Sequence, residues 1–163
     1  MTDFPRLLAA LQGSGVEFII IGGFAATAHG SAYVTVDLDV VYRRTTENMA
    51  HLATALEPLQ PYLRGAPPGL PFRLDVDTIK RGLNFTLTTN AGDLDLLGEA
   101  TGGGTYDALL SQSQVREVLG FDCRFVNLET LIHLKRAAGR PKDFERIAEL
   151  ELLQQERQSA DPS

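Results

Sequence analysis

The pattern of apolar and polar positions along the chain predicts short strands that alternate with amphipathic helices. Apolar runs and period-two alternation predict strands, whereas apolar positions three or four residues apart predict helices. The predicted strands cover residues 16–21, 37–42, 71–76, 83–89, 93–97 and a hairpin at 116–126. The predicted helices cover residues 5–13, 23–29, 45–59, 106–113, 128–138 and 141–156. This mixture indicates an α/β or α+β domain around one sheet.

Length and composition set the broad class of the protein. With 163 residues, 44% of them hydrophobic and 22% charged, the chain is close to the globular average. We expect one domain over residues 1–153, followed by a polar, disordered tail over residues 154–163. The longest apolar run, Phe18–Ile21, is too short to cross a bilayer, and the N-terminus lacks the layout of a signal peptide. The single cysteine, Cys123, fits a reducing compartment, so we expect a cytoplasmic protein without a membrane partner.

Two glycines, Gly22 and Gly23, stand between the strand at 16–21 and the helix that follows it. Glycines at such a turn let backbone N–H groups approach a ligand, and the start of a helix carries a partial positive charge. Both features favour a phosphate group. On the glycines alone, a plain tight turn is the favoured interpretation, and the chain contains no P-loop motif.

Two strands carry aspartates at alternate positions, Asp37-x-Asp39 and Asp93-x-Asp95. Residues two apart on a strand point to the same face, so each pair holds two like charges side by side. A divalent cation such as Mg²⁺ would compensate them, although a solvated outer face carrying ordinary acids is the alternative. If the two strands are neighbours, three or four carboxylates converge as in a two-metal site.

A predicted helix near the C-terminus carries a lysine, Lys135, on or beside its apolar stripe. Such a lysine either extends its amine to solvent or holds a phosphate as a point charge. Arg140 and Lys142 flank a helix break, where side chains can project toward a ligand. Asp143 lies in the expected first turn of the next helix, where a carboxylate also stabilises the helix dipole.

Other chemistry-bearing residues are interpreted as structural. Asp75 and Asp77 form a third alternating pair, but they have basic neighbours with which they can pair. The three histidines match no metal-binding or catalytic pattern, and we expect His29 to pack or to cap the short helix that it ends.

Taken in order, Ile21-Gly22-Gly23, Asp37-x-Asp39 and a later strand with Asp95 resemble the minimal nucleotidyltransferases of the polymerase-β superfamily. The stretch "GGFAATAHG…VTVDLDV" and the segment "HLKRAAGRPKDFERIAEL" are similar to the bacterial branch that includes the AbiEii/MenT-type toxins. The resemblance covers roughly residues 16–150. It implies a polymerase-β-like fold with a mixed central sheet flanked by helices. It also implies metal-dependent transfer of a nucleoside monophosphate from an NTP to a hydroxyl group.

The resemblance assigns roles to individual residues. Asp37, Asp39 and Asp95 would hold two Mg²⁺ ions, with Mn²⁺ as an alternative, and together with Lys135 they would form the catalytic set. The implied nucleotide-binding residues are Gly22, Gly23, Lys135, Arg140, Lys142 and Asp143.

The implied acceptor is a tRNA 3′ end, a protein hydroxyl or a small molecule, and a toxin would have an antitoxin partner. The net charge of −6 argues against RNA, whereas the basic residues around Lys135 and Arg140 favour it.

Two departures from the family pattern favour a function without catalysis. Gly23 stands where other members have serine, and Tyr33 stands near the place of an arginine. The alternative is a catalytically inactive nucleotide-binding or interaction module of the same fold.

Overall fold

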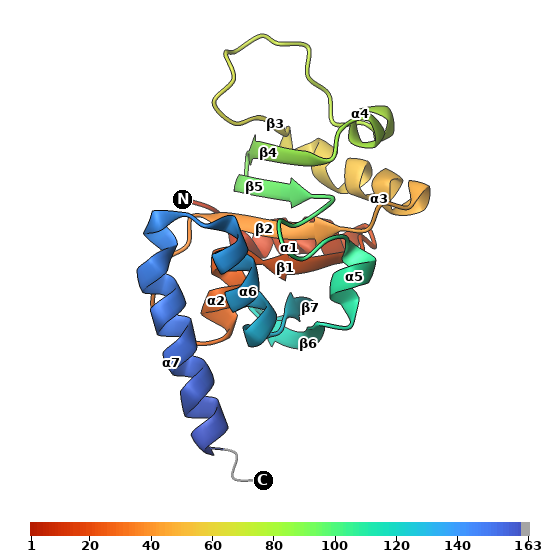
Figure 1. Cartoon of the computed structure of the whole chain (residues 1–163). Coiled ribbons are helices and arrows are strands. Elements are labelled where there is room, and N and C mark those ends of the chain that lie inside the picture. The colour runs from red at the N-terminus through yellow and green to blue at the C-terminus, as the bar shows by residue number, and fades with distance from the viewer. Residues whose placement is uncertain (161–163) are drawn as a thin grey trace.

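A seven-stranded mixed sheet forms the centre of the computed structural model, which describes residues 1–160 (Figure 1). The strands lie in the order β3-β4-β5-β2-β1-β7-β6. Two neighbouring pairs are parallel, β2 with β5 and β1 with β7, and the other pairs are antiparallel. The strand bounds are β1 Phe18–Ile21, β2 Asp37–Tyr42, β3 Tyr62–Leu63, β4 Asn84–Thr89, β5 Gly92–Leu97, β6 Ser113–Val118 and β7 Phe121–Val126. This architecture confirms the expected α/β class with a mixed sheet.

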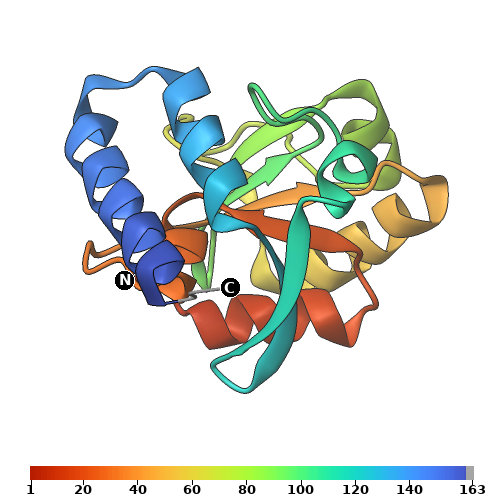
Figure 2. The same ribbon diagram turned by 60° about the horizontal axis from the view of Figure 1, so that its bottom comes forward.

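Helices cover both faces of the sheet. Helix α1 packs beside α3 on one face, whereas α6 lies on the other face and packs beside α2 and α7 (Figures 1 and 2). The helix bounds are α1 Phe4–Gly13, α2 Gly22–Ala28, α3 Thr46–Leu56, α4 Val76–Arg81, α5 Tyr106–Leu110, α6 Leu128–Ala138 and α7 Phe144–Ala160. Short 3₁₀ turns span Glu57–Leu59 and Pro141–Asp143. Within residues 1–160, none of the helices combines the length and the apolar character that crossing a membrane requires.

The apolar pattern of the central strands explains how the sheet is buried. All four residues of β1 are buried, as expected for a strand covered on both faces. In β2, Leu38 and Val40 are fully buried, whereas Asp37 and Asp39 point to the opposite face and are half-buried. Strand β5 repeats this alternation, with Leu94 and Leu96 in the core. The core therefore fixes which face of the sheet carries the aspartates.

The strand predicted over residues 71–76 is wrong. The carboxylate of Asp75 accepts a hydrogen bond from the Thr78 backbone N–H at 2.9 Å and caps α4, which begins at Val76. The alternating apolar residues of this stretch suggested a strand, but the capping aspartate begins a helix instead. The interpretation of Asp75 as a structural residue is confirmed.

The C-terminal helix extends further than the sequence suggested. The sequence predicted a helix as far as residue 156, but α7 continues to Ala160, so residues 154–160 of the expected polar tail belong to it. Residues 161–163 lie outside the described part of the chain. Arg157 on this helix donates hydrogen bonds to the Nδ1 atom and the carbonyl oxygen of His29, each at 3.0 Å. His29 is 2% exposed, and its Nε2–H donates to the Val126 carbonyl oxygen at 2.8 Å. Burial lowers the pKa of His29, so the prediction of a packing histidine is confirmed.

We predict that Arg157→Met weakens the attachment of α7 to α2. The free energy of unfolding should fall by about 1–2 kcal/mol, because two acceptors of His29 lose their donor. Urea denaturation would measure this difference. Glu156→Ala, on the exposed surface of the same helix, is the matched control and should change stability little. Equal stability of the two variants would contradict the prediction.

Candidate functional site

Three carboxylates from two neighbouring strands meet on one face of the sheet. The parallel pairing of β2 with β5 places Asp39 opposite Asp95 and Asp37 opposite Asp93. One oxygen atom from each of Asp37, Asp39 and Asp95 lies within 4.8 Å of the other two. The condition on which the sequence argument depended, that the two aspartate strands are neighbours, is therefore confirmed. Asp93 lies on the same strand face but is not one of the three clustered residues.

The two glycines bring the backbone against these carboxylates. Gly22 has a φ angle of +70°, and a Cβ atom at this position would overlap the Asp39 carboxylate. A Cβ atom at Gly23 would lie 2.6 Å from the Thr35 hydroxyl oxygen, so a serine would not fit there without movement of Thr35. Helix α2 begins at Gly22, directly beside the carboxylates. Contact of Gly22 and Gly23 with a phosphate group stays a prediction.

A second group of charged residues lies around Asp143, which is 1% exposed. Arg140 donates from Nε to an Asp143 oxygen at 2.8 Å. The Lys135 Nζ and an Arg146 Nη each lie 3.9 Å from the other Asp143 oxygen. Lys135 is itself only 7% exposed, and burial lowers its pKa. Asp143 lies just before α7 rather than inside it, and it organises three cations.

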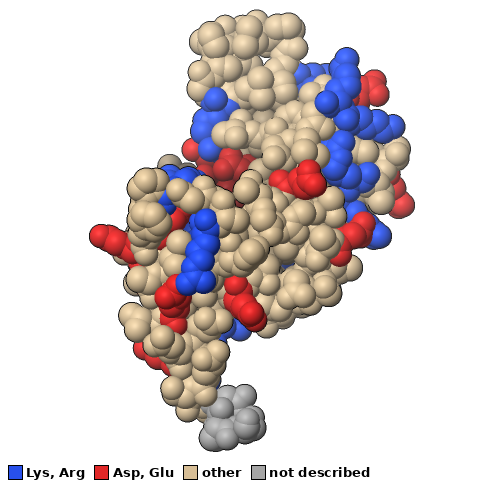
Figure 3. All heavy atoms as spheres, viewed as in Figure 1, with Lys and Arg blue, Asp and Glu red and all other residues tan. Residues whose placement is uncertain are grey.

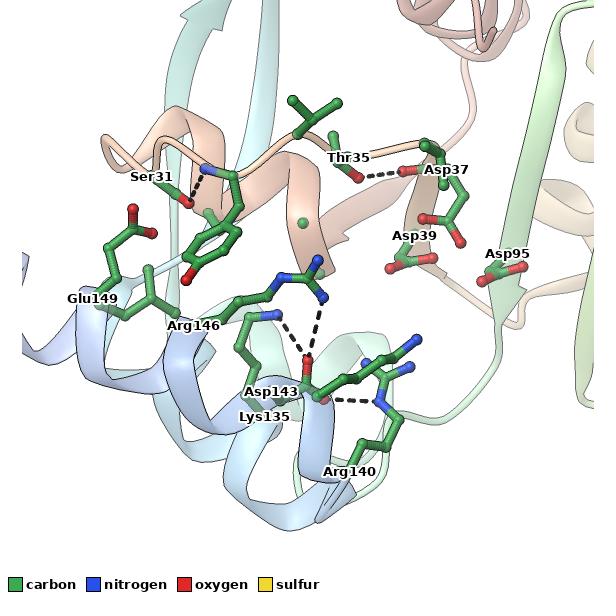
Figure 4. A pocket seen from close by; sticks show the side chains of 18 residues that line it. Ser31, Thr35, Asp37, Asp39, Asp95, Lys135, Arg140, Asp143, Arg146 and Glu149 are labelled. Carbon is green, nitrogen blue, oxygen red and sulfur yellow. Dashed lines mark hydrogen bonds and ion pairs between the residues drawn. The ribbon is translucent and has the colours of Figure 1, made fainter.

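A single pocket with a volume of about 210 Å³ connects the two groups. Figure 4 shows Asp37, Asp39 and Asp95 at one end, with Lys135, Arg140 and Arg146 reaching toward them from α6, α7 and the turn between them. In Figure 3, acidic side chains gather in a hollow of this face, with basic side chains on both sides. The structure brings together every site residue named from the sequence: Gly22, Gly23, Asp37, Asp39, Asp95, Lys135, Arg140, Lys142 and Asp143.

Sequence reasoning missed an arginine that contacts the carboxylates directly. Arg64 follows β3, and its guanidinium lies 3.0 Å from Asp95, 3.5 Å from Asp93 and 3.9 Å from Asp37. Its position at the start of a Pro/Gly loop carries no sequence pattern that would have revealed these contacts.

Other pocket residues were also missed. The Arg146 guanidinium lies 5.2 Å from the centre of the Tyr33 ring, and Glu149 accepts a hydrogen bond from the Ala32 N–H at 3.0 Å. These contacts connect the segment between α2 and β2 to α7.

The electrostatics of the cluster favour a proton or a cation. Burial, followed by the neighbouring carboxylates Asp95 and Asp37, raises the pKa of Asp39 to about 8. Burial and Asp95 also raise the pKa of Asp37, and Arg64 opposes this shift only in part. Without a bound cation, protonation of Asp39 therefore relieves part of the repulsion among the three carboxylates.

The donor set fits a hard divalent metal ion. Asp39 Oδ1 and Asp95 Oδ1 are buried and have no hydrogen-bond partner among residues 1–160. Arg64 Nη2 lies 3.0 Å from Asp95 Oδ1, but it donates its hydrogen bond to the Leu87 carbonyl oxygen at 2.7 Å. Carboxylate oxygens without partners are the ligands that Mg²⁺ and Mn²⁺ prefer. Asp37, Asp39 and Asp95 are thus positioned to hold such an ion.

The fold is similar to that of a provisionally assigned nucleotidyltransferase from Thermotoga maritima, with a TM-score of 0.55. The similarity covers 90% of this chain and 88% of that chain. The two sequences are 12% identical, so the comparison concerns the fold alone. No protein-family model matches the chain, and no curated protein matches it in sequence. The expectation of a nucleotidyltransferase-type fold is confirmed, whereas the AbiEii/MenT branch stays a prediction.

We predict that the metal-free protein loses stability as the pH rises toward 8. The Asp39 carboxyl keeps a proton up to a pKa of about 8 in the folded chain, whereas the ordinary value is 3.8. Between these values the folded chain binds more protons than the unfolded chain, so the free energy of unfolding falls with increasing pH. Asp39→Asn should make this slope shallower, since Asp37 also has a raised pKa, and should gain on the order of a few kcal/mol relative to wild type at high pH.

Urea denaturation in the presence of a chelator, at about pH 5 and about pH 9, would measure the slopes. Asp77→Asn, on the exposed surface of α4, is the control and should follow the wild type. Parallel slopes in wild type and Asp39→Asn would contradict a raised pKa at Asp39.

We also predict that Gly22→Ala displaces Asp39. The added methyl group overlaps the carboxylate, so Mn²⁺ affinity should fall about ten-fold or more, which calorimetry would measure. Gly69→Ala is the matched control, because Gly69 also has a positive φ, +91°, but open space around its Cβ position. Both variants carry the backbone cost of about 1–3 kcal/mol, and only Gly22→Ala should lose metal affinity. Equal Mn²⁺ affinities would show that Asp39 does not depend on Gly22.

Proposed function

We propose that this protein is a Mg²⁺-dependent nucleotidyltransferase that moves a nucleoside monophosphate from an NTP to a hydroxyl acceptor. The observation that carries the proposal is the convergence of three aspartates from β2 and β5 across one pocket from Lys135. A ligand with a chain of phosphates would meet a cation-binding cluster at one end and basic side chains at the other. Few other ligands need both a bound cation and basic side chains.

The basic side chains supply the triphosphate half of the site. Lys135 is buried. Asp143 pairs with Lys135, Arg140 and Arg146, and thereby holds all three cations in place. Because these cations are positioned before any ligand arrives, they can stabilise the charge that develops on the phosphates without rearrangement. Gly22 and Gly23 leave room for phosphate oxygens to approach the backbone beside Asp39.

The reaction in this proposal is an in-line displacement at the α-phosphorus. The acceptor oxygen forms a bond to the α-phosphorus, the bond to the oxygen bridging to the β-phosphate breaks, and pyrophosphate leaves. Asp95 either takes the proton of the attacking hydroxyl group or helps to orient that hydroxyl group. Divalent ions held by Asp37, Asp39 and Asp95 would offset the charge of the phosphate oxygens and lower the pKa of the attacking hydroxyl.

The proposal also includes an acceptor that carries the attacking hydroxyl group. A tRNA 3′ end, a protein hydroxyl or a small molecule would dock beside the carboxylates. A toxin role with an antitoxin partner rests on the sequence resemblance. The pocket itself supports the nucleotide half of the reaction.

A second candidate function is that of a nucleotide-binding module without catalysis. Two observations favour it. Thr35 fills the space beside Gly23 in which a serine side chain would stand, and the guanidinium of Arg64 already contacts the carboxylates. A module of this kind would bind a nucleotide but would release no pyrophosphate.

We predict magnesium-dependent binding of at least one of the four NTPs, measured by calorimetry with and without Mg²⁺. Asp37→Asn and Asp39→Asn should each abolish this binding and any release of pyrophosphate, because each removes a carboxylate of the cluster. Asp77→Asn is the matched control, since it removes an aspartate of the alternating pair that lies outside the pocket. Folding of each variant would be checked by circular dichroism.

Three results separate the alternatives. Binding accompanied by pyrophosphate release, in a screen of hydroxyl acceptors with labelled NTP, supports the transferase. Binding without pyrophosphate release supports the module. Absence of binding to all four NTPs contradicts both functions for the isolated chain.

A further inference from the structure

Arg64 is anchored to the sheet on the β3–β4 side of the carboxylates. Its backbone N–H donates to the Thr86 carbonyl oxygen of β4 at 3.0 Å, and its Nη2 donates to the Leu87 carbonyl oxygen at 2.7 Å. Its side chain is 28% exposed. The guanidinium is therefore held beside the cluster by the fold, not only by attraction to the aspartates.

The contacts between Arg64 and the aspartates are ion pairs without good hydrogen-bond geometry. Arg64 Nε lies 3.5 Å from Asp93 Oδ1 and is a buried donor with no hydrogen-bond partner among residues 1–160. Asp95 Oδ1, 3.0 Å from Nη2, is likewise an acceptor without a hydrogen bond in the described chain. Hydrogen bonds of ideal geometry would resist displacement, whereas these ion pairs depend mainly on charge.

One guanidinium faces more negative charge than it can balance. It contacts Asp37, Asp93 and Asp95, and Asp39 is not among its ion-pair partners. Two of the three aspartates that it contacts, Asp37 and Asp95, also belong to the three-carboxylate cluster. A divalent ion bound there would need oxygens of the same carboxylates, and it would repel the guanidinium at a distance of a few ångströms.

We propose that Arg64 is an internal counter-ion that competes with the divalent metal ion and leaves Asp37 and Asp95 when the metal binds. This inference rests on the proposed function for its metal ion, and it adds a control on metal loading. After displacement, the bond to Leu87 and the anchored backbone keep the guanidinium near the cluster.

Displacement also gives Arg64 a new partner. Lys135 belongs to α6, whereas Arg64 directly follows β3. Figure 1 shows α6 and β3 on opposite sides of β5. A free guanidinium binds phosphate or carboxylate with two parallel hydrogen bonds. Arg64 then offers an anion contact on the side of the aspartates away from Lys135. Metal loading and binding of an anionic ligand on that side are thereby coupled.

The test is Mn²⁺ affinity of the full chain, measured by calorimetry and by electron paramagnetic resonance without nucleotide. Arg64→Gln should bind Mn²⁺ more tightly than wild type, by on the order of ten-fold, because the competing cation is gone. Arg73→Gln, which removes the same charge from an exposed position outside the pocket, should match the wild type. Without metal, Arg64→Gln should have the lower melting temperature, and saturating Mn²⁺ should raise it more than it raises that of wild type.

A crystal structure with Mn²⁺ separates direct exchange from a long-range charge effect. We expect the ion among Asp37, Asp39 and Asp95, and the guanidinium of Arg64 out of contact with Asp95. Equal or weaker Mn²⁺ affinity in Arg64→Gln, or an ion bound with Arg64 still on Asp95, would overturn the inference and leave the proposed function intact. Absence of Mn²⁺ binding in every variant would overturn the metal dependence of the proposed function and this inference with it.

Discussion

The parallel pairing of β2 with β5 is the constraint on which the rest of the site depends. Leu38 and Leu94 are fully buried on one face of the sheet, so the aspartates that alternate with them must lie on the other. A slip of one residue would turn these carboxylates into the core, which makes the register strongly specified. Burial of apolar side chains therefore holds the aspartates together against their mutual repulsion. The raised pKa of Asp39 reflects that opposition.

The charged side chains around the pocket form two groups, and each group has an unbalanced charge. The carboxylate cluster has an excess of negative charge, and only Arg64 contacts it as an ion-pair partner among the described residues. On the other side, buried Asp143 is surrounded by Lys135, Arg140 and Arg146, an excess of positive charge. A metal ion would satisfy the first group, and a polyphosphate would satisfy the second. The net charge of the whole chain, −6, conceals this local separation.

The sequence was most informative where local patterns coincide with burial. Strands β1, β2 and β5 were recognisable because their apolar residues pack into the core, and β6 and β7 correspond to the hairpin predicted over residues 116–126. The strand predicted over residues 71–76 failed because the alternation of apolar residues competes there with a helix cap at Asp75, and the cap determines the structure. The end of α7 beyond residue 156 was missed because it depends on contacts between Arg157 and His29, which are far apart in the sequence.

The residues of the candidate site can be identified from the sequence alone. The sequence supplied the aspartates at alternate strand positions, the glycine pair at the start of α2, and the lysine beside an apolar helix face. That these groups share one pocket, and that Arg64 lies against the carboxylates, becomes visible only in the folded chain. The physical reason is that alternation and helix spacing are local properties, which each segment carries in its own residues. Strand neighbours and ion pairs are instead set by how the whole core packs, and no single segment encodes them.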